Sequence, residues 1–225
     1  MSRGAFIAVR ARLILPGIIA LAAAVGAAGA QDFDVAFWDA AVTDPERDRE
    51  IRYRVRYPLG FAGAAPVVLI SHGGLGSKNG HTTLGHLGDE YAAHGYLGIH
   101  LNHLPSEDGL QHRRDRPADV SHIVDRLVAG TLPLPPDFAG SADAAHIGHI
   151  GHSMGSYTAS AVGGAVLTHG VYEDPQILAI GNLSPAGRDR HGFFDEGPGD
   201  NSWRGMQVPA LNLIGDLERQ GEYLT

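Results

Sequence analysis

Residues 145–166 read AHIGHIGHSMGSYTASAVGGAV, and this stretch decides the fold. It begins with a short apolar run typical of a buried strand and ends in small residues with helical spacing. Between the two stands Gly151-His152-Ser153-Met154-Gly155, a G-x-S-x-G motif. In this context the serine lies on a strained strand-to-helix turn, and the flanking glycines let other backbone pack closely. The pattern therefore favours Ser153 as a nucleophile over the alternative, a plain turn serine.

The same alternation of apolar runs and helical segments continues on both sides of the motif. Segments with helical spacing lie at residues 86–94, 119–129 and 154–167. The apolar runs are short and end in glycine or polar residues: PVVLIS (66–71), YLGIHLN (96–102), ILAIGNL (177–183) and PALNLIG (209–215). Such runs are typical of strands buried on both faces, so they predict a mostly parallel sheet flanked by helices.

Two earlier segments, residues 33–42 and 50–57, instead alternate apolar and polar residues. This period of two is typical of strands with one wet face, and a turn-prone TDPERD segment joins them. We expect an antiparallel pair at one edge of the sheet.

A second glycine-rich segment, Ser71-His72-Gly73-Gly74-Leu75-Gly76, follows the run PVVLI. Its backbone N–H groups are placed to form an oxyanion hole beyond the strand end. We expect the two donors to be the N–H groups of Gly74 and of Met154, with Leu75 as the alternative to Gly74. A simple turn and a phosphate-binding loop are the competing interpretations, but neither G-x-G-x-x-G nor G-K-[ST] is present.

Taken together, SHGGLGS, DVSHIVDRL, GHSMGS, LAIGNLSPAG and VPALNLIGDLE resemble the α/β-hydrolases of the dienelactone hydrolase and platelet-activating-factor acetylhydrolase group. The resemblance covers roughly residues 33–218. It implies an α/β-hydrolase fold and hydrolysis of a small-molecule or lipid-like carboxylic ester through an acyl-enzyme. It also implies that no cofactor takes part. Its motifs are more specific for the fold and the serine nucleophile than for the substrate.

The acid of the triad is expected after one of the two strands that follow the nucleophile, because this fold orders the triad Ser, acid, His. After PALNLI the chain reads Gly215-Asp216-Leu217-Glu218. The family's G-x-x-D/E spacing places Glu218 in the acid's position, and Asp216 is the alternative.

The histidine of the triad has no counterpart after Glu218, and the printed chain ends at Thr225. We expect the native gene to continue through one more strand, a loop that carries the histidine and a final helix. On this interpretation the chain is C-terminally truncated and inactive as it stands. His191 is the alternative base within the chain, and His152 is expected to pack beneath the serine turn.

The N-terminal residues 1–30 have the pattern of a signal peptide, with Arg3, Arg10 and Arg12 before an apolar stretch from 13 to 30. Ala28-Gly29-Ala30 offers small residues for cleavage before Gln31. A membrane anchor is the alternative, but the stretch is short and holds Pro16. We therefore expect one hydrolase domain, residues 31–225, that is exported to the periplasm or secreted, without a stable membrane anchor after cleavage.

Composition narrows the classes of function further. The 225-residue chain has a net charge of -8 and no basic stripe, so we expect no nucleic-acid partner. It has no cysteine, so covalent catalysis would need a hydroxyl nucleophile. The histidines at 146, 149 and 152 are three apart on a predicted strand, so they alternate between faces and predict no metal site. A serine peptidase and a non-catalytic binding protein with the same fold remain the alternative functions.

Overall fold

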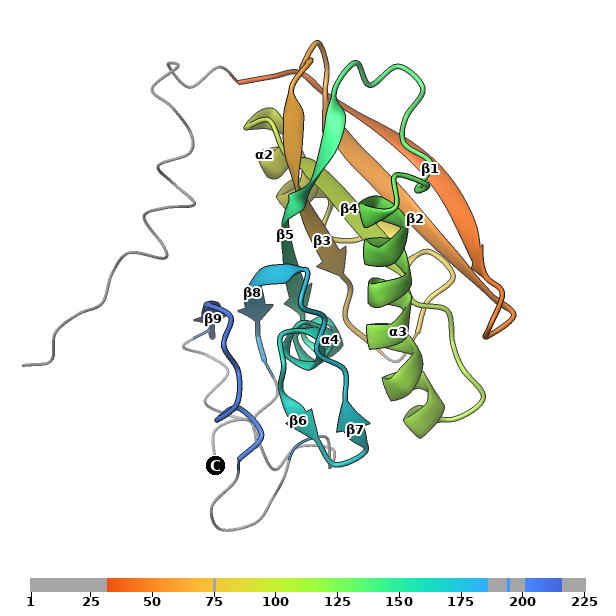
Figure 1. The fold of residues 1–225 in the computed structure, drawn as a ribbon, viewed down its shortest axis with the longest axis vertical. Coiled ribbons are helices and arrows are strands. Elements are labelled where there is room, and N and C mark those ends of the chain that lie inside the picture. Colours follow the sequence, from red (N-terminus) through yellow and green to blue (C-terminus); the bar gives the residue numbers. More distant parts are fainter. Residues whose placement is uncertain (1–31, 75, 186–193, 195–200, 216–225) are drawn as a thin grey trace, which may run out of the picture. The chain divides into compact units, whose positions relative to one another are not determined.

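The computed structural model describes residues 32–74, 76–185, 194 and 201–215, and residues Gln31–Thr225 form one compact unit. A seven-stranded sheet runs through this unit in the order β1-β2-β4-β3-β5-β8-β9 (Figure 1). Its strands are β1 (Val35–Asp44), β2 (Arg49–Pro58), β3 (Ala64–Ser71), β4 (Leu97–Asn102), β5 (Ser141–His152), β8 (Ile177–Leu183) and β9 (Ala210–Leu213). Strands β1 and β2 are antiparallel to their neighbours, and all pairs from β4 to β9 are parallel. The predicted α/β class, the mainly parallel sheet and the antiparallel edge pair are thus confirmed.

Helices cover both faces of the sheet, because alternate residues of the buried strands point to opposite sides. Val68 and Ile70 of β3 pack toward α2 (Gly85–Ala93). Val67 and Leu69 belong instead to the larger core, which includes apolar residues of α3 (Gly109–Val128) and α4 (Met154–Val162). In Figure 1, α3 and α4 lie in front of the sheet and α2 lies behind it. The central strands are continuous apolar runs because both of their faces are buried.

The smaller elements are a 3-10 turn, η1 (Gly80–Thr82), and a two-stranded hairpin of β6 (Val166–Leu167) and β7 (Gly170–Val171). The hairpin corrects the expectation of a helix over residues 154–167. Helix α4 ends at Val162, since Gly163 caps it and Gly164 has a φ of +99°, a left-handed conformation that glycine adopts without strain.

Helix α3 begins ten residues before the predicted start at 119, with Asp108 as its N-cap. The carboxylate of Asp108 accepts a hydrogen bond of 2.7 Å from the backbone N–H of Gln111. Pro117 lies inside the helix and has no N–H to donate to the carbonyl of Arg113. The hydroxyl of Tyr157 on α4 donates to that carbonyl at 3.0 Å instead. A side chain of the neighbouring helix therefore makes the interior proline tolerable.

Strand β9 closes the described part of the sheet and pairs with β8. Its apolar side chains Leu211 and Leu213 are 58% and 52% exposed. No helix among the residues that the structure describes has the length and apolarity that a membrane crossing needs.

The hydrogen bond from the Tyr157 hydroxyl to the Arg113 carbonyl gives a testable stability effect. Tyr157→Phe should lower the free energy of unfolding by about 1 kcal/mol, because it removes the hydroxyl that donates to the Arg113 carbonyl and contacts Nε2 of His169. In a Pro117→Ala background the restored N–H of residue 117 can bond that carbonyl, so the same substitution should cost less. Urea denaturation of the four proteins measures the difference. Equal costs in both backgrounds would contradict this account.

Candidate functional site

Ser153 occupies the single residue between β5 and α4, with φ 54° and ψ -114°. A non-glycine residue with positive φ is strained, and such strain persists only where the surroundings hold it in place. The backbone N–H of Ser153 donates to the carbonyl of Leu183 at 2.9 Å, which ties the turn to β8. The strand, turn and helix predicted around the G-x-S-x-G motif are therefore present.

Both glycines of the motif are required by close backbone contacts. A Cβ atom at Gly151 would lie 2.0 Å from the carbonyl oxygen of Gly155. A Cβ atom at Gly155 would lie 2.1 Å from the carbonyl oxygen of Ser71, at the end of β3. Any side chain at these positions would push the turn apart, so glycine at both positions fixes where Ser153 lies.

The glycine-rich loop after β3 passes directly beside the serine. A Cβ atom at Gly73 would lie 3.2 Å from the Cβ atom of Ser153. Gly74 has a φ of +80° and open space on its Cβ side. Ser153, Gly73 and Gly74 line one cleft of about 330 Å³, together with His72, His152, Ser77, Gly80, Thr83 and Leu84. The structure thus brings the predicted residues Ser153 and Gly74 to the same cleft.

Met154, the other predicted oxyanion donor, is the first residue of α4 and is buried. The first N–H groups of a helix have no partner within the helix, and the helix dipole places partial positive charge there. The start of α4 next to Ser153 is therefore suited to stabilising a negative charge that develops on a bound substrate.

His72 also lines the cleft, but both of its ring nitrogens are engaged. Its Nδ1 lies 2.7 Å from the carbonyl oxygen of Gly73, and its Nε2 accepts from the backbone N–H of His103 at 3.1 Å. These partners place the proton on Nδ1. Burial, more than the nearby Arg116, lowers the pKa of His72 to about 4, so the ring is neutral at pH 7. His72 is consequently not free to act as a general base.

His152 differs from expectation. It is half-buried and lines the cleft beside Ser153, whereas the sequence led us to expect it beneath the turn. The reason is that the turn at Ser153 and the glycine-rich loop approach each other closely. A Cβ atom at Gly73 would lie 3.1 Å from Nδ1 of His152. The imidazole therefore faces the glycine-rich loop.

Several predicted residues lie outside the described part of the chain. These are the acid candidates Glu218 and Asp216, the alternative donor Leu75, the alternative base His191, and the N-terminal residues 1–30. Their roles stay predictions.

A buried polar layer beneath the loop was not anticipated from the sequence. Ser71 Oγ lies 2.9 Å from Nε2 of His103 and 2.8 Å from Nε2 of His149. His103 Nδ1 lies 3.1 Å from Oδ2 of Asp119, and Oδ1 of the same carboxylate accepts from Arg47 and Arg49 at 2.9 and 2.8 Å. One set of neutral tautomers satisfies all these contacts, with Ser71 donating to His103 and accepting from His149.

The geometry of Ser71, His103 and Asp119 is that of a serine triad, but it has no access to substrate. All three residues are completely buried, and none of them lines the cleft. Burial lowers the pKa of His103 well below its usual value, which keeps the ring neutral. This layer is therefore a support beneath the β3 strand end, where the glycine-rich loop begins.

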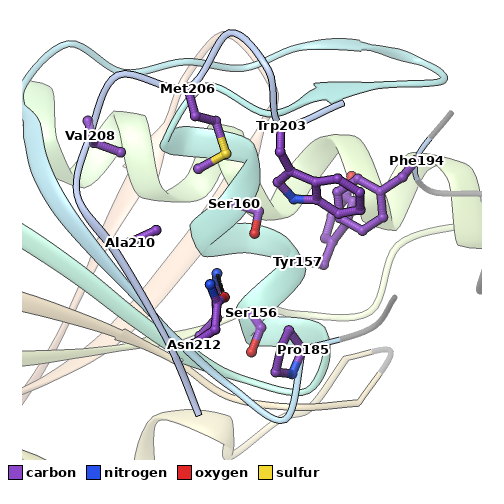
Figure 2. Close-up of a pocket in the computed structure, with 11 residues that line it drawn as sticks. Ser156, Tyr157, Ser160, Pro185, Phe194, Trp203, Met206, Val208, Ala210 and Asn212 are labelled. Atoms are coloured by element: carbon purple, nitrogen blue, oxygen red, sulfur yellow. Dashed lines mark hydrogen bonds between the residues drawn. The ribbon is translucent and has the colours of Figure 1, made fainter. Parts of the chain in front are cut away.

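A second cavity, of about 420 Å³, lies between α4, β8 and β9 and is separate from Ser153 (Figure 2). Figure 2 shows Tyr157, Phe194 and Trp203 along one side and Met206 above. The ring centroids of Phe194 and Trp203 are 4.4 Å apart. One side of this cavity is thus aromatic, while Ser156, Ser160, Asn182 and Asn212 add polar groups to its lining.

Comparisons with known proteins address the fold alone. No protein-family model matches the chain, and no curated protein matches it. A solved structure of a ferulic acid esterase from Streptomyces cinnamoneus is similar in fold, with a TM-score of 0.53 and 21% sequence identity. The match covers 83% of this chain and 66% of that esterase, so the chain spans slightly less than two thirds of its length.

Buried histidines give the protein a defined acid sensitivity. Burial, the largest cause at each site, lowers the pKa of His72 and His112 to about 4 and that of His100 and His149 to about 3. Between about pH 6.5 and pH 4 the unfolded chain therefore binds protons that the folded protein does not. The free energy of unfolding should fall as the pH is lowered through this window and should change little above about pH 7.

His149→Gln tests the effect at one site, because glutamine can still donate to Ser71 without titrating. The substitution should reduce the slope of unfolding free energy against pH by up to about 1.4 kcal/mol per pH unit near pH 5. His86→Gln, at an exposed position of α2, is the matched control and should leave the slope unchanged. Urea denaturation across pH 4 to 8 measures both. An unchanged slope for His149→Gln would show that this ring is already protonated in the fold.

Proposed function

We propose that the protein is a serine hydrolase of the α/β-hydrolase fold that cleaves carboxylic esters through an acyl-enzyme on Ser153. The observation that carries the proposal is the strained turn at Ser153, held against the glycine-rich loop in one cleft. Strain of this kind costs about 1–3 kcal/mol and is found mainly at functional sites. The esterase named above has a similar fold, which supports ester hydrolysis as the reaction class.

In the proposed reaction, the hydroxyl oxygen of Ser153 attacks the carbonyl carbon of the ester while a histidine takes its proton. The carbonyl oxygen becomes an oxyanion that the N–H groups of Gly74 and Met154 stabilise. The histidine then returns the proton to the leaving alcohol, and the acyl group stays on Ser153. Water attacks the acyl-enzyme by the same steps in reverse and releases the acid. The chemistry needs no cofactor.

The acid of the proposed triad is Glu218, with Asp216 as the alternative. It would accept a hydrogen bond from the histidine and hold that ring in the tautomer that accepts the serine proton. In this fold's order the histidine follows the acid along the chain.

We further propose that the protein acts after export, with residues 1–30 removed as a signal peptide. The proposed substrate is a small or lipid-like ester, since the cleft of about 330 Å³ is open and modest in size. No nucleic acid is expected to bind a chain with a net charge of -8.

Ser153→Ala tests the nucleophile. A fluorophosphonate probe should label the native protein at one serine, and the substitution should abolish both labelling and hydrolysis of p-nitrophenyl acetate. Ser77→Ala, which removes another hydroxyl of the same cleft, should keep the labelling. Labelling that survives Ser153→Ala would refute the assignment. Faster cleavage of a chromogenic dipeptide than of the acetate would instead indicate a serine peptidase.

Glu218→Gln and Asp216→Asn test the acid as a matched pair of amide substitutions. Glu218→Gln should lower kcat by several orders of magnitude, because an amide in this place favours the wrong imidazole tautomer. Asp216→Asn should have a much smaller effect on kcat. The opposite ranking in steady-state kinetics would assign the acid to Asp216.

A further inference from the structure

Arg116 is a buried cation in the middle of α3 that the proposed reaction does not use. Its side chain is completely buried, and no ion pair among the described residues includes it. The carboxylate one turn away, Asp119, is instead bound by Arg47 and Arg49. Burial lowers the pKa of Arg116 to about 9, so the guanidinium is still charged at pH 7. A buried charge without a carboxylate partner is unfavourable unless its N–H groups are satisfied by other acceptors.

The acceptors of this guanidinium all belong to the elements that form the proposed oxyanion hole. Nη2 donates to the carbonyl of His72, and Nη1 donates to the carbonyl of Gly74 at 3.2 Å. Nε donates to the hydroxyl of Thr158 at 2.8 Å. That hydroxyl in turn donates to the carbonyl of Met154 at 3.1 Å. One side chain therefore connects the glycine-rich loop with the first turn of α4.

These contacts fix the direction of the loop's N–H groups, because C=O and N–H point opposite ways in a trans peptide. The peptide between Gly73 and Gly74 has its carbonyl held by the imidazole of His72 at 2.7 Å, so the N–H of Gly74 points to the other side. Arg116 holds the carbonyls of His72 and Gly74, on either side of this peptide. Gly74 has φ +80° and, as a glycine, no side chain that could hold the loop in place.

We propose that Arg116 is a positioning residue for the oxyanion hole, holding the Gly74 and Met154 donors at the spacing that the tetrahedral intermediate requires. The inference rests on the proposed function, since it assigns Arg116 a role in the same reaction. Arg116 does not line the cleft, so it acts on the transition state through the backbone it holds and leaves ester binding largely unaffected.

Arg116→Lys is the first test. A lysine keeps the charge but cannot reach both carbonyls and Thr158 at once, because it lacks the planar fork of donors. We expect kcat for p-nitrophenyl acetate to fall by about 10- to 100-fold, somewhat less than the loss of a whole oxyanion donor, with KM within about threefold. Arg114→Lys, at an exposed position of the same helix, should leave kcat unchanged. Thermal denaturation of each variant confirms that the protein is folded.

A pair of substitutions at Thr158 repeats the test without touching the charge. Thr158→Val removes the hydroxyl that links Arg116 to Met154 and keeps the side-chain shape, so kcat should fall by about 3- to 30-fold. Thr158→Ser keeps the hydroxyl and should retain most of the activity. This pair keeps the inference testable if Arg116→Lys fails to fold.

A matched ester and thionoester separate positioning from a general effect on folding. Sulfur accepts hydrogen bonds weakly, so an oxyanion hole accelerates the thionoester much less than the oxygen ester. The ratio of the two kcat/KM values should therefore drop in parallel with the ester's kcat, by about 10- to 100-fold in Arg116→Lys and about 3- to 30-fold in Thr158→Val. A loss of folded protein would lower both rates equally and leave the ratio unchanged.

The outcomes distinguish the inference from the function on which it rests. Native protein without Ser153-dependent turnover would overturn both. Native protein with such turnover, whose Arg116→Lys and Thr158→Val variants keep the native kcat and the native ester-to-thionoester ratio, would overturn the inference alone. A reduced ratio in both variants, with Arg114→Lys and Thr158→Ser near the native value, would establish it.

Discussion

The constraint on which the rest of the site depends is the contact between Gly155 and the end of β3. A Cβ atom at Gly155 would lie 2.1 Å from the carbonyl of Ser71, so the start of α4 and the start of the glycine-rich loop meet backbone to backbone. This contact places Ser153 and Gly74 in one cleft although about 80 residues separate them in sequence. Parallel pairing of β3 with β5, from Val67↔Ile147 to Ser71↔Gly151, sets the register that makes the approach possible.

Glycine allows this approach but cannot hold it, because it brings no side chain and loses much conformational entropy on folding. The rigidity comes from the buried polar groups around the loop. Hydrogen bonds of Ser71 join the end of β3 to His149 of β5 and to His103, which directly follows β4. Arg116 joins the loop to α4. Ser71, His149 and Arg116 have neutral or backbone partners, and His103 also contacts the ion-paired carboxylate of Asp119. Burial of these groups would be unfavourable without this set of hydrogen bonds.

The sequence predicted the elements whose signal is local. The strand ILAIGNL and the first residue of α4 were predicted to the residue, since apolar runs and the G-x-S-x-G motif mark them. The first half of α3 was missed because its buried side carries His112, Asp115 and Arg116, so no apolar period of 3.6 is visible there. The support beneath the loop joins positions 16 to 78 residues apart, and no spacing rule reveals hydrogen bonds over such separations. A charged residue at a core position of a helix, as Arg116 is in α3, is the signal that could have revealed this support.

The missed start of α3 and the support of the glycine-rich loop have the same cause. The buried face of α3 that lacks an apolar period is the face whose Arg116 holds the loop carbonyls. A helix with an apolar stripe there would pack on the sheet equally well, yet it would offer the loop carbonyls no donor. The carbonyls of His72 and Gly74 would then need water or another side chain, and the loop would gain freedom next to Ser153. In the proposed reaction, oxyanion stabilisation depends on donors that are already in place before charge develops, so such freedom would lower the rate. The departure of α3 from ordinary amphipathic patterning is therefore best understood as a requirement of the site.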